Sequence, residues 1–174
     1  MIVLLDASTV INLVNGGVFD AVLGIEGVRF QVGSLVRDEA SSASEVLDLE
    51  LAKGSLTLAD DGLVPYSAFL AAKNDMGLGD GETECILIAS AIQCQIACDD
   101  GRARKAAIKR LGHESLVTGS LGLMQRACSQ GLITTEAAQL AYQEMRKLGG
   151  YLPQIDVDFF AKEVTLLDGF GAQP

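Results

Sequence analysis

The chain has 174 residues, 49% hydrophobic and 21% charged, and is long enough for one compact core but short for two independent domains. Four cysteines without a Cys-x-x-Cys pair, and a single histidine, argue against structural zinc and against a disulfide framework. With 23 acidic and 13 basic residues, the net charge of −10 excludes RNA binding by bulk attraction, so any contact with RNA has to be local.

The chain begins with Met1 and four apolar residues before Asp6. It lacks the basic region and the small-residue cleavage site of a secretory signal. The longest apolar stretch, residues 85–98, is too short and too polar to cross a bilayer. We therefore expect a cytoplasmic protein without a membrane helix.

Apolar periodicity and turn residues predict strands that alternate with helices over the first two thirds of the chain. The predicted strands are residues 2–5, 28–32, 55–59, 95–98 and 115–118. The predicted helices are residues 8–14, 19–25, 34–39, 41–53, 66–76, 82–93, 102–111, 121–129, 135–148 and 156–164. This alternation predicts an α/β fold with a mainly parallel sheet, because parallel strands need crossover connections.

Acidic residues stand where predicted strands end or helices begin. Asp6 directly follows the first strand, Asp99 and Asp100 follow the strand 95–98, and Glu82 and Glu84 lie in the first turn of the helix before that strand. Taken singly, each acid can be a helix cap or a turn residue. Taken together, Asp6 and Asp100 would meet on adjacent strands, where their repulsion favours a bound cation.

The ligands available to such a cation are oxygens only, which suits Mg²⁺ or Mn²⁺. These ions activate water and neutralise charge on a phosphodiester, so the pattern predicts hydrolysis of a phosphate ester. Arg102 and Arg104 follow Asp100 closely and could hold substrate phosphate. They could equally pair with Asp99 and Asp100, and the sequence leaves both readings open.

Four segments resemble the acidic motifs of PIN-domain nucleases, in the family's order: IVLLDASTVINL, SLVRDEA, GLGDGETECILIA and IACDDGRARKAA. Together with the tail VTGSLGLMQRACSQGLIT, they look most like a branch with Gly-Glu-x-Glu and Asp-Asp-x-x-Ala-Arg motifs. The resemblance implies a single-domain α/β fold, with about five mainly parallel strands, helices on both faces and additional C-terminal helices. Residues 1–149 would form the PIN-like domain, and 150–174 a helical extension packed on it.

The resemblance also implies the site and its partners. Asp6, Glu39, Glu82 and Asp100 match the four acids, with Asp38 as the alternative to Glu39, and Glu84 should turn away. Metal would be held by Asp6, Glu82, Asp99 and Asp100, and substrate by Ser8, Arg102 and Arg104. The implied activity is Mg²⁺- or Mn²⁺-dependent cleavage of single-stranded RNA. Many small members, the VapC-like toxins, are homodimers neutralised by an antitoxin.

Two features depart from the usual family pattern: the third acid is Glu82 instead of Asp, and Cys98 replaces a hydroxyl residue. Two other functions are compatible with the fold. The chain could be a catalytically silent binding module whose acids receive a partner's arginine. Phosphoryl transfer through an aspartyl phosphate ranks lower, because Ser8 stands where a second Asp is expected and the loop after Thr118 lacks a lysine.

Overall fold

The structure is a computed structural model in which residues 1–162 are described. Its centre is a five-stranded sheet in the order β3-β2-β1-β4-β5, and all neighbouring strands are parallel. The strands are β1 (Ile2–Leu5), β2 (Arg29–Val32), β3 (Leu56–Leu58), β4 (Gln95–Ala97) and β5 (Val117–Thr118). The predicted α/β fold with a parallel sheet is therefore confirmed.

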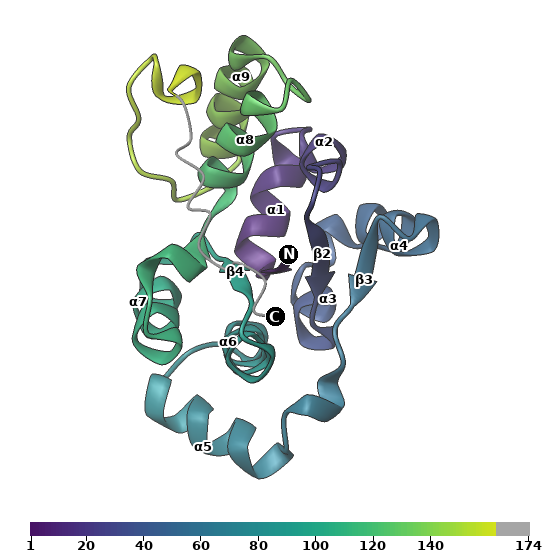
Figure 1. The fold of residues 1–174 in the computed structure, drawn as a ribbon, viewed down its shortest axis with the longest axis vertical. Coiled ribbons are helices and arrows are strands. Elements are labelled where there is room, and N and C mark those ends of the chain that lie inside the picture. The colour runs from purple at the N-terminus through teal and green to yellow at the C-terminus, as the bar shows by residue number, and fades with distance from the viewer. Residues whose placement is uncertain (163–174) are drawn as a thin grey trace, which may run out of the picture.

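Helices form two groups around the sheet (Figure 1). In the first group, α1 (Ala7–Asn15) packs with α2 (Phe19–Leu23), α8 (Ser120–Ser129) and α9 (Thr135–Lys147). In the second, α6 (Asp80–Ile92) packs with α3 (Ser34–Glu39), α5 (Tyr66–Met76) and α7 (Gly101–Leu111). Helix α4 (Ser44–Lys53) covers β3, next to the 3-10 helix η1 (Ser41–Ala43). Three more 3-10 helices are η2 (Asp61–Leu63), η3 (Glu114–Leu116) and η4 (Phe159–Ala161).

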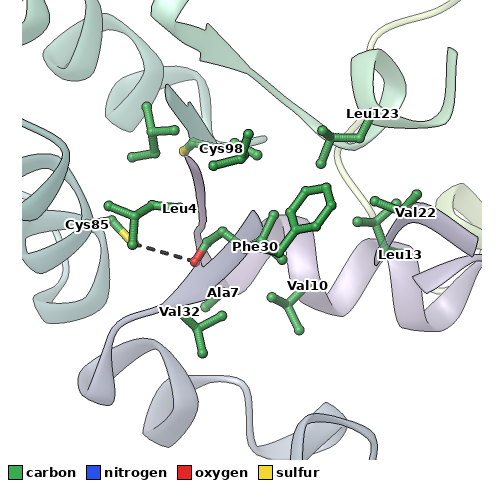
Figure 2. Packing of buried hydrophobic residues seen from close by; sticks show 14 of the residues in the cluster. Leu4, Ala7, Val10, Leu13, Val22, Phe30, Val32, Cys85, Cys98 and Leu123 are labelled. Carbon is green, nitrogen blue, oxygen red and sulfur yellow. Dashed lines mark hydrogen bonds between the residues drawn. The ribbon is translucent and has the colours of Figure 1, made fainter. Parts of the chain in front are cut away.

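The core lies around β1, whose side chains Val3, Leu4 and Leu5 are fully buried. Figure 2 shows Phe30 and Val32 of the sheet on the side of Val10 and Leu13 of α1, and Leu4 on the side of Cys85 of α6. A strand that is buried on both faces has apolar side chains at successive positions, and the sequence of β1 is such a continuous apolar run. Burial of this strand fixes the position of the residue that follows it, Asp6.

Two differences from the predicted elements are small. Helix α6 begins at Asp80, two residues earlier than predicted, because the backbone N–H of Gly79 donates to Glu82 and closes the first turn. Within the predicted helix 156–164, the structure has only the short helix η4, packed on α8 and α9. Residues 163–174, the rest of the predicted extension, lie outside the described residues.

The sheet order creates a crevice beside β1. The chain adds β2 and β3 on one side of β1 and then β4 and β5 on the other. Ligands of open α/β sheets bind at such a change of direction, at the carboxyl ends of the strands. Leu5 is paired with Ala97, so Asp6 and the residues after β4 leave the sheet together at this point.

No helix of the described residues is long and apolar enough to cross a membrane.

Candidate functional site

The predicted acids meet at the carboxyl ends of β1 and β4. Asp6 follows β1, and its backbone N–H donates to Ala97 at 2.9 Å. Asp100 lies at the start of α7 and Glu82 at the start of α6. The charges of Asp6, Asp100 and Glu39 all act on Glu82. Four carboxylates far apart in the sequence therefore share one electrostatic environment.

Each of these four carboxylates uses one oxygen to bind the protein. Asp6 Oδ2 accepts from Ser8 at 2.6 Å, and Glu39 Oε1 accepts from Gly81 N–H at 2.9 Å. Glu82 Oε2 accepts from Gly79 N–H at 2.9 Å, and Asp100 Oδ1 accepts from the first amides of α7. The second oxygen of each accepts no hydrogen bond from residues 1–162. One oxygen thus orients each side chain, and the other is free for a ligand.

Glycines allow two of the acids to approach each other. A methyl group built on Gly79 would lie 3.5 Å from Glu82 Oε2 and 3.6 Å from Glu39 Oε1, so both carboxylates flank this residue. A methyl group on Gly81 would overlap Glu39 Oε2. Gly81 in the predicted motif GLGDGETE therefore keeps space for Glu39 at the start of α6, whereas a methyl group on Gly79 would make only ordinary contacts.

Burial raises the pKa values of two site acids. The side chain of Asp6 is 1% exposed, and desolvation raises its pKa although hydrogen bonds from Ser8 and Cys98 oppose the shift. Desolvation also raises the pKa of Glu82, partly opposed by the Gly79 N–H, and the negative charges of Asp6, Asp100 and Glu39 raise it further. Both shifts show that negative charge is unfavourable here without a cation.

The remaining acids are bonded differently. Both oxygens of Asp99 are occupied, by Asn12 Nδ2 at 2.8 Å and by the Ser120 N–H at 2.9 Å. Both oxygens of Glu84 are also occupied, at the start of α3, so Glu84 turns away from the cluster as expected. Asp38 is exposed, whereas Glu39 bonds to α6. The geometry favours Glu39 over Asp38 and gives Asp99 a role in joining α1 to α8.

The three predicted substrate-binding residues all contact the protein. Ser8 donates to Asp6 and accepts from the backbone N–H of Asp99, which links β1 to the loop after β4. Arg104 donates to the carbonyls of Cys98 and Thr118, the ends of β4 and β5. Arg102 is exposed and donates to the Gly77 carbonyl at 2.7 Å. Arg102 uses one of its five N–H groups in this bond, so it has further donors.

The sequence singled out Cys98 as a departure from the family pattern but did not predict Asn12 as a site residue. The Cys98 thiol donates to Asp6 Oδ2 at 3.4 Å, so it takes the position of the usual hydroxyl as a weak donor. Asn12 binds Asp99 from α1. The polar position of Asn12 on an otherwise apolar helix face was the available signal, since buried polar side chains need partners.

The donor set fits a hard divalent cation. Asp6 Oδ1 is a buried oxygen without a hydrogen-bond partner, and oxygen donors alone suit Mg²⁺ or Mn²⁺. Within residues 1–162, no three acidic, Cys or His side chains already stand in ligand positions. Binding would therefore have to draw the free oxygens inward, against the repulsion that now separates them.

A family profile for the PIN domain matches residues 2–164 of the chain. No curated protein and no solved structure matches it. PIN domains have a nuclease-type fold, in agreement with acids gathered at the carboxyl end of a parallel sheet. The match extends over nearly all of the sequence, so the chain belongs to the PIN domain family.

Proposed function

We propose that the protein is a metal-dependent endoribonuclease that hydrolyses phosphodiester bonds in single-stranded RNA. One observation carries the proposal: Asp6, Glu39, Glu82 and Asp100 each keep one carboxylate oxygen without a partner in residues 1–162. In Asp99 and Glu84, acids of the same region, both oxygens are occupied. The free oxygens support a role for these four acids as ligands in addition to their hydrogen bonds with the protein.

Asp6, Glu82 and Asp100 would hold Mg²⁺ or Mn²⁺, and Glu39 would bind an attacking water or a second ion. The bound cation would lower the pKa of water and neutralise charge on the phosphate. Ser8 and Cys98 orient Asp6, and the amides at the start of α7 orient Asp100. The exposed Arg102 would bind a phosphate of the substrate. Metal binding by Asp99 remains a prediction, and its bonds to Asn12 and Ser120 favour a positioning role.

Substitution of single acids tests the proposal. Asp6→Asn, Glu82→Gln or Asp100→Asn is expected to reduce Mn²⁺-dependent cleavage of a labelled single-stranded RNA by over about 100-fold, which is more than the loss of a residue that only orients a metal ligand. Asp100→Asn is the most informative of these, because Asn caps a helix as well as Asp does and α7 should persist.

A neighbouring pair of acids supplies the matched control. Glu39→Gln is expected to impair cleavage, and Asp38→Asn, one residue earlier and exposed, is expected to leave it unchanged. Circular dichroism would establish that each variant is folded. Equal cleavage by the wild type and folded Asp100→Asn protein in Mn²⁺ would refute the nuclease proposal.

We also propose that the protein is the toxin of a toxin-antitoxin pair and forms a homodimer. An exposed apolar surface supports a protein partner. Helix α5 has no buried residue, and Leu63, Tyr66 and Leu70 in and beside it are 42%, 74% and 41% exposed. Apolar side chains grouped on a surface mark interaction sites. Figure 1 shows α5 at the edge of the molecule, next to α6.

A further inference from the structure

A hollow with both polar and apolar lining residues adjoins the carboxylate cluster on the side of α1. Its volume is about 250 Å³, below the usual range for sites that hold a whole small ligand. Ser8 lines it and binds Asp6, and Asp100 lines it and belongs to the cluster, so the hollow borders the cluster. The opposite wall is the turn after α9, residues 148–151. A molecule bound to the cluster would therefore reach into the hollow.

The charge of the lining excludes a phosphate site. Among the described residues that line the hollow there is no Lys or Arg, whereas Asp99 and Asp100 are both present. Phosphate groups are bound by Lys, Arg or helix N-termini, and carboxylates repel them. The uncharged part of a nucleotide, its base, is compatible with this lining, and the hollow has room for little more than one base.

The polar side chains available to a base edge are amides. Asn15, at the end of α1, is half-buried, and its amide makes no hydrogen bond with residues 1–162. An amide offers two donors and an acceptor, the complement of a base edge. Asn12 is different, because its Nδ2 is already bound to Asp99. Asn15 is thus the side chain that can read the base.

The aromatic ring at the rim is placed by a tightly built turn. Tyr151 is 98% exposed although it lines the hollow. Gly150 precedes it and donates to the Met145 carbonyl at 2.8 Å. A methyl group on Gly150 would overlap Asn12 Oδ1, so glycine lets the turn lie directly against α1. An exposed tyrosine on such a turn offers a flat face on which a base can stack.

We propose that this hollow binds one nucleobase of the RNA, next to the phosphodiester that is cleaved. Tyr151 stacks on the base, and Asn15 binds its edge. The choice of RNA as ligand rests on the proposed function, but the base site makes a separate claim about binding.

Binding can be measured without cleavage in the Asp6→Asn background with Mn²⁺ present. Fluorescence anisotropy with labelled single-stranded RNA would give the Kd of this variant and of double variants. Adding Tyr151→Ala is expected to weaken binding on the order of tenfold, the loss of one stacked base, and Tyr151→Phe is expected to keep the affinity. Tyr66→Ala is the matched control, because Tyr66 is an exposed tyrosine on α5, outside the hollow.

The contact proposed between Asn15 and the edge of the base can be tested separately from the stacking contact of Tyr151. In the same background, Asn15→Ala is expected to reduce the differences in Kd among the four homopolymers, because the edge contact is lost and the stacking contact remains. Differences that persist unchanged in Asn15→Ala would overturn the assignment of that residue.

The base site fails if Tyr151→Ala and Tyr66→Ala bind RNA equally well, or if the Asp6→Asn protein binds no RNA. Failure of the proposed function looks different. In that case wild-type protein would bind RNA through Tyr151 without cutting it in Mn²⁺, and the base site would stand.

Discussion

At the scale of single residues, Asp6 determines the character of the site. It is buried directly after the central strand, with Oδ2 held by Ser8 and Cys98 and Oδ1 without a partner. A buried carboxylate that lacks a countercharge destabilises the folded state. Asp6 therefore couples protein stability to both pH and metal.

The metal-free protein is expected to lose stability as pH rises from the ordinary carboxyl pKa values of 3.8 and 4.5 into the raised range of Asp6 and Glu82. In that window the folded state holds more protons than the unfolded state, so the free energy of unfolding falls with pH. Thermal melts in EDTA would measure the slope attributable to Asp6 as the difference between wild type and Asp6→Asn.

Mn²⁺ at neutral pH is expected to reverse this loss in the wild type, because ligand binding to the folded state raises Tm. A shift of several degrees is expected at saturating Mn²⁺, since about 1 kcal/mol corresponds to roughly 2–4 °C at this size. The Asp6→Asn variant should show a smaller Mn²⁺ shift. An equal shift in both proteins would mean that Asp6 is not a metal ligand.

At the scale of elements, the start of α6 holds Glu39, the last residue of α3, in place. Gly81 gives its N–H to Glu39, and its missing side chain leaves the space that Glu39 fills. Helix α7 begins in a similar way with Gly101, but a methyl group there would meet nothing within 4 Å. The two glycines form a matched pair for testing whether helix geometry positions the site.

Gly81→Ala is expected to reduce cleavage by at least about tenfold, because the new methyl group displaces Glu39. Gly101→Ala is expected to leave kcat/KM unchanged and to alter stability by no more than about 1 kcal/mol. Cleavage assays and thermal melts on both variants would measure these effects. Full activity in Gly81→Ala would show that Glu39 is dispensable.

The strands and helices were largely predictable from the sequence, because each strand is an apolar run bounded by turn residues. The positions of the acids were predictable because they follow those runs. The parallel sheet was therefore foreseen, and so was the position of Asp6 and Asp100 after two strands that pair with each other. Hydrogen bonds between distant segments were not. The bonds of Arg104 to the ends of β4 and β5, and of Asp99 to Asn12, depend on which segments become neighbours in space. Sequence spacing carries no information about such contacts.

At the scale of the whole molecule, the acidic net charge opposes the binding of RNA at the proposed local site. The net charge of −10 opposes RNA binding by bulk attraction, so the proposed site would have to offset it locally, through a cation and Arg102. Non-specific binding should consequently be weak, and substrate recognition should depend on the cluster and the hollow beside it. The exposed surface of α5 is separate from both and remains available to a protein.

The toxin proposal predicts that expression of the wild-type chain alone in a bacterial host arrests growth. Asp6→Asn is expected to remove the effect, since it disables cleavage and leaves α5 intact. Growth curves after induction, with protein levels compared by immunoblot, would measure it, and light scattering of purified protein would show whether its mass is that of a dimer. Normal growth at a high level of active wild-type protein would contradict the toxin role.

The sheet order also sets when activity can arise during synthesis. Strand β1 is synthesised before β4, although the two strands are neighbours in the sheet. Leu5 of β1 pairs with Ala97 of β4, which lies some ninety residues later in the chain. A nascent chain that ends before Asp100 has Asp6 but lacks the opposite half of its catalytic cluster. For a nuclease, this ordering means that the segment through Asp100 has to be translated before the product can harm any transcript, including its own.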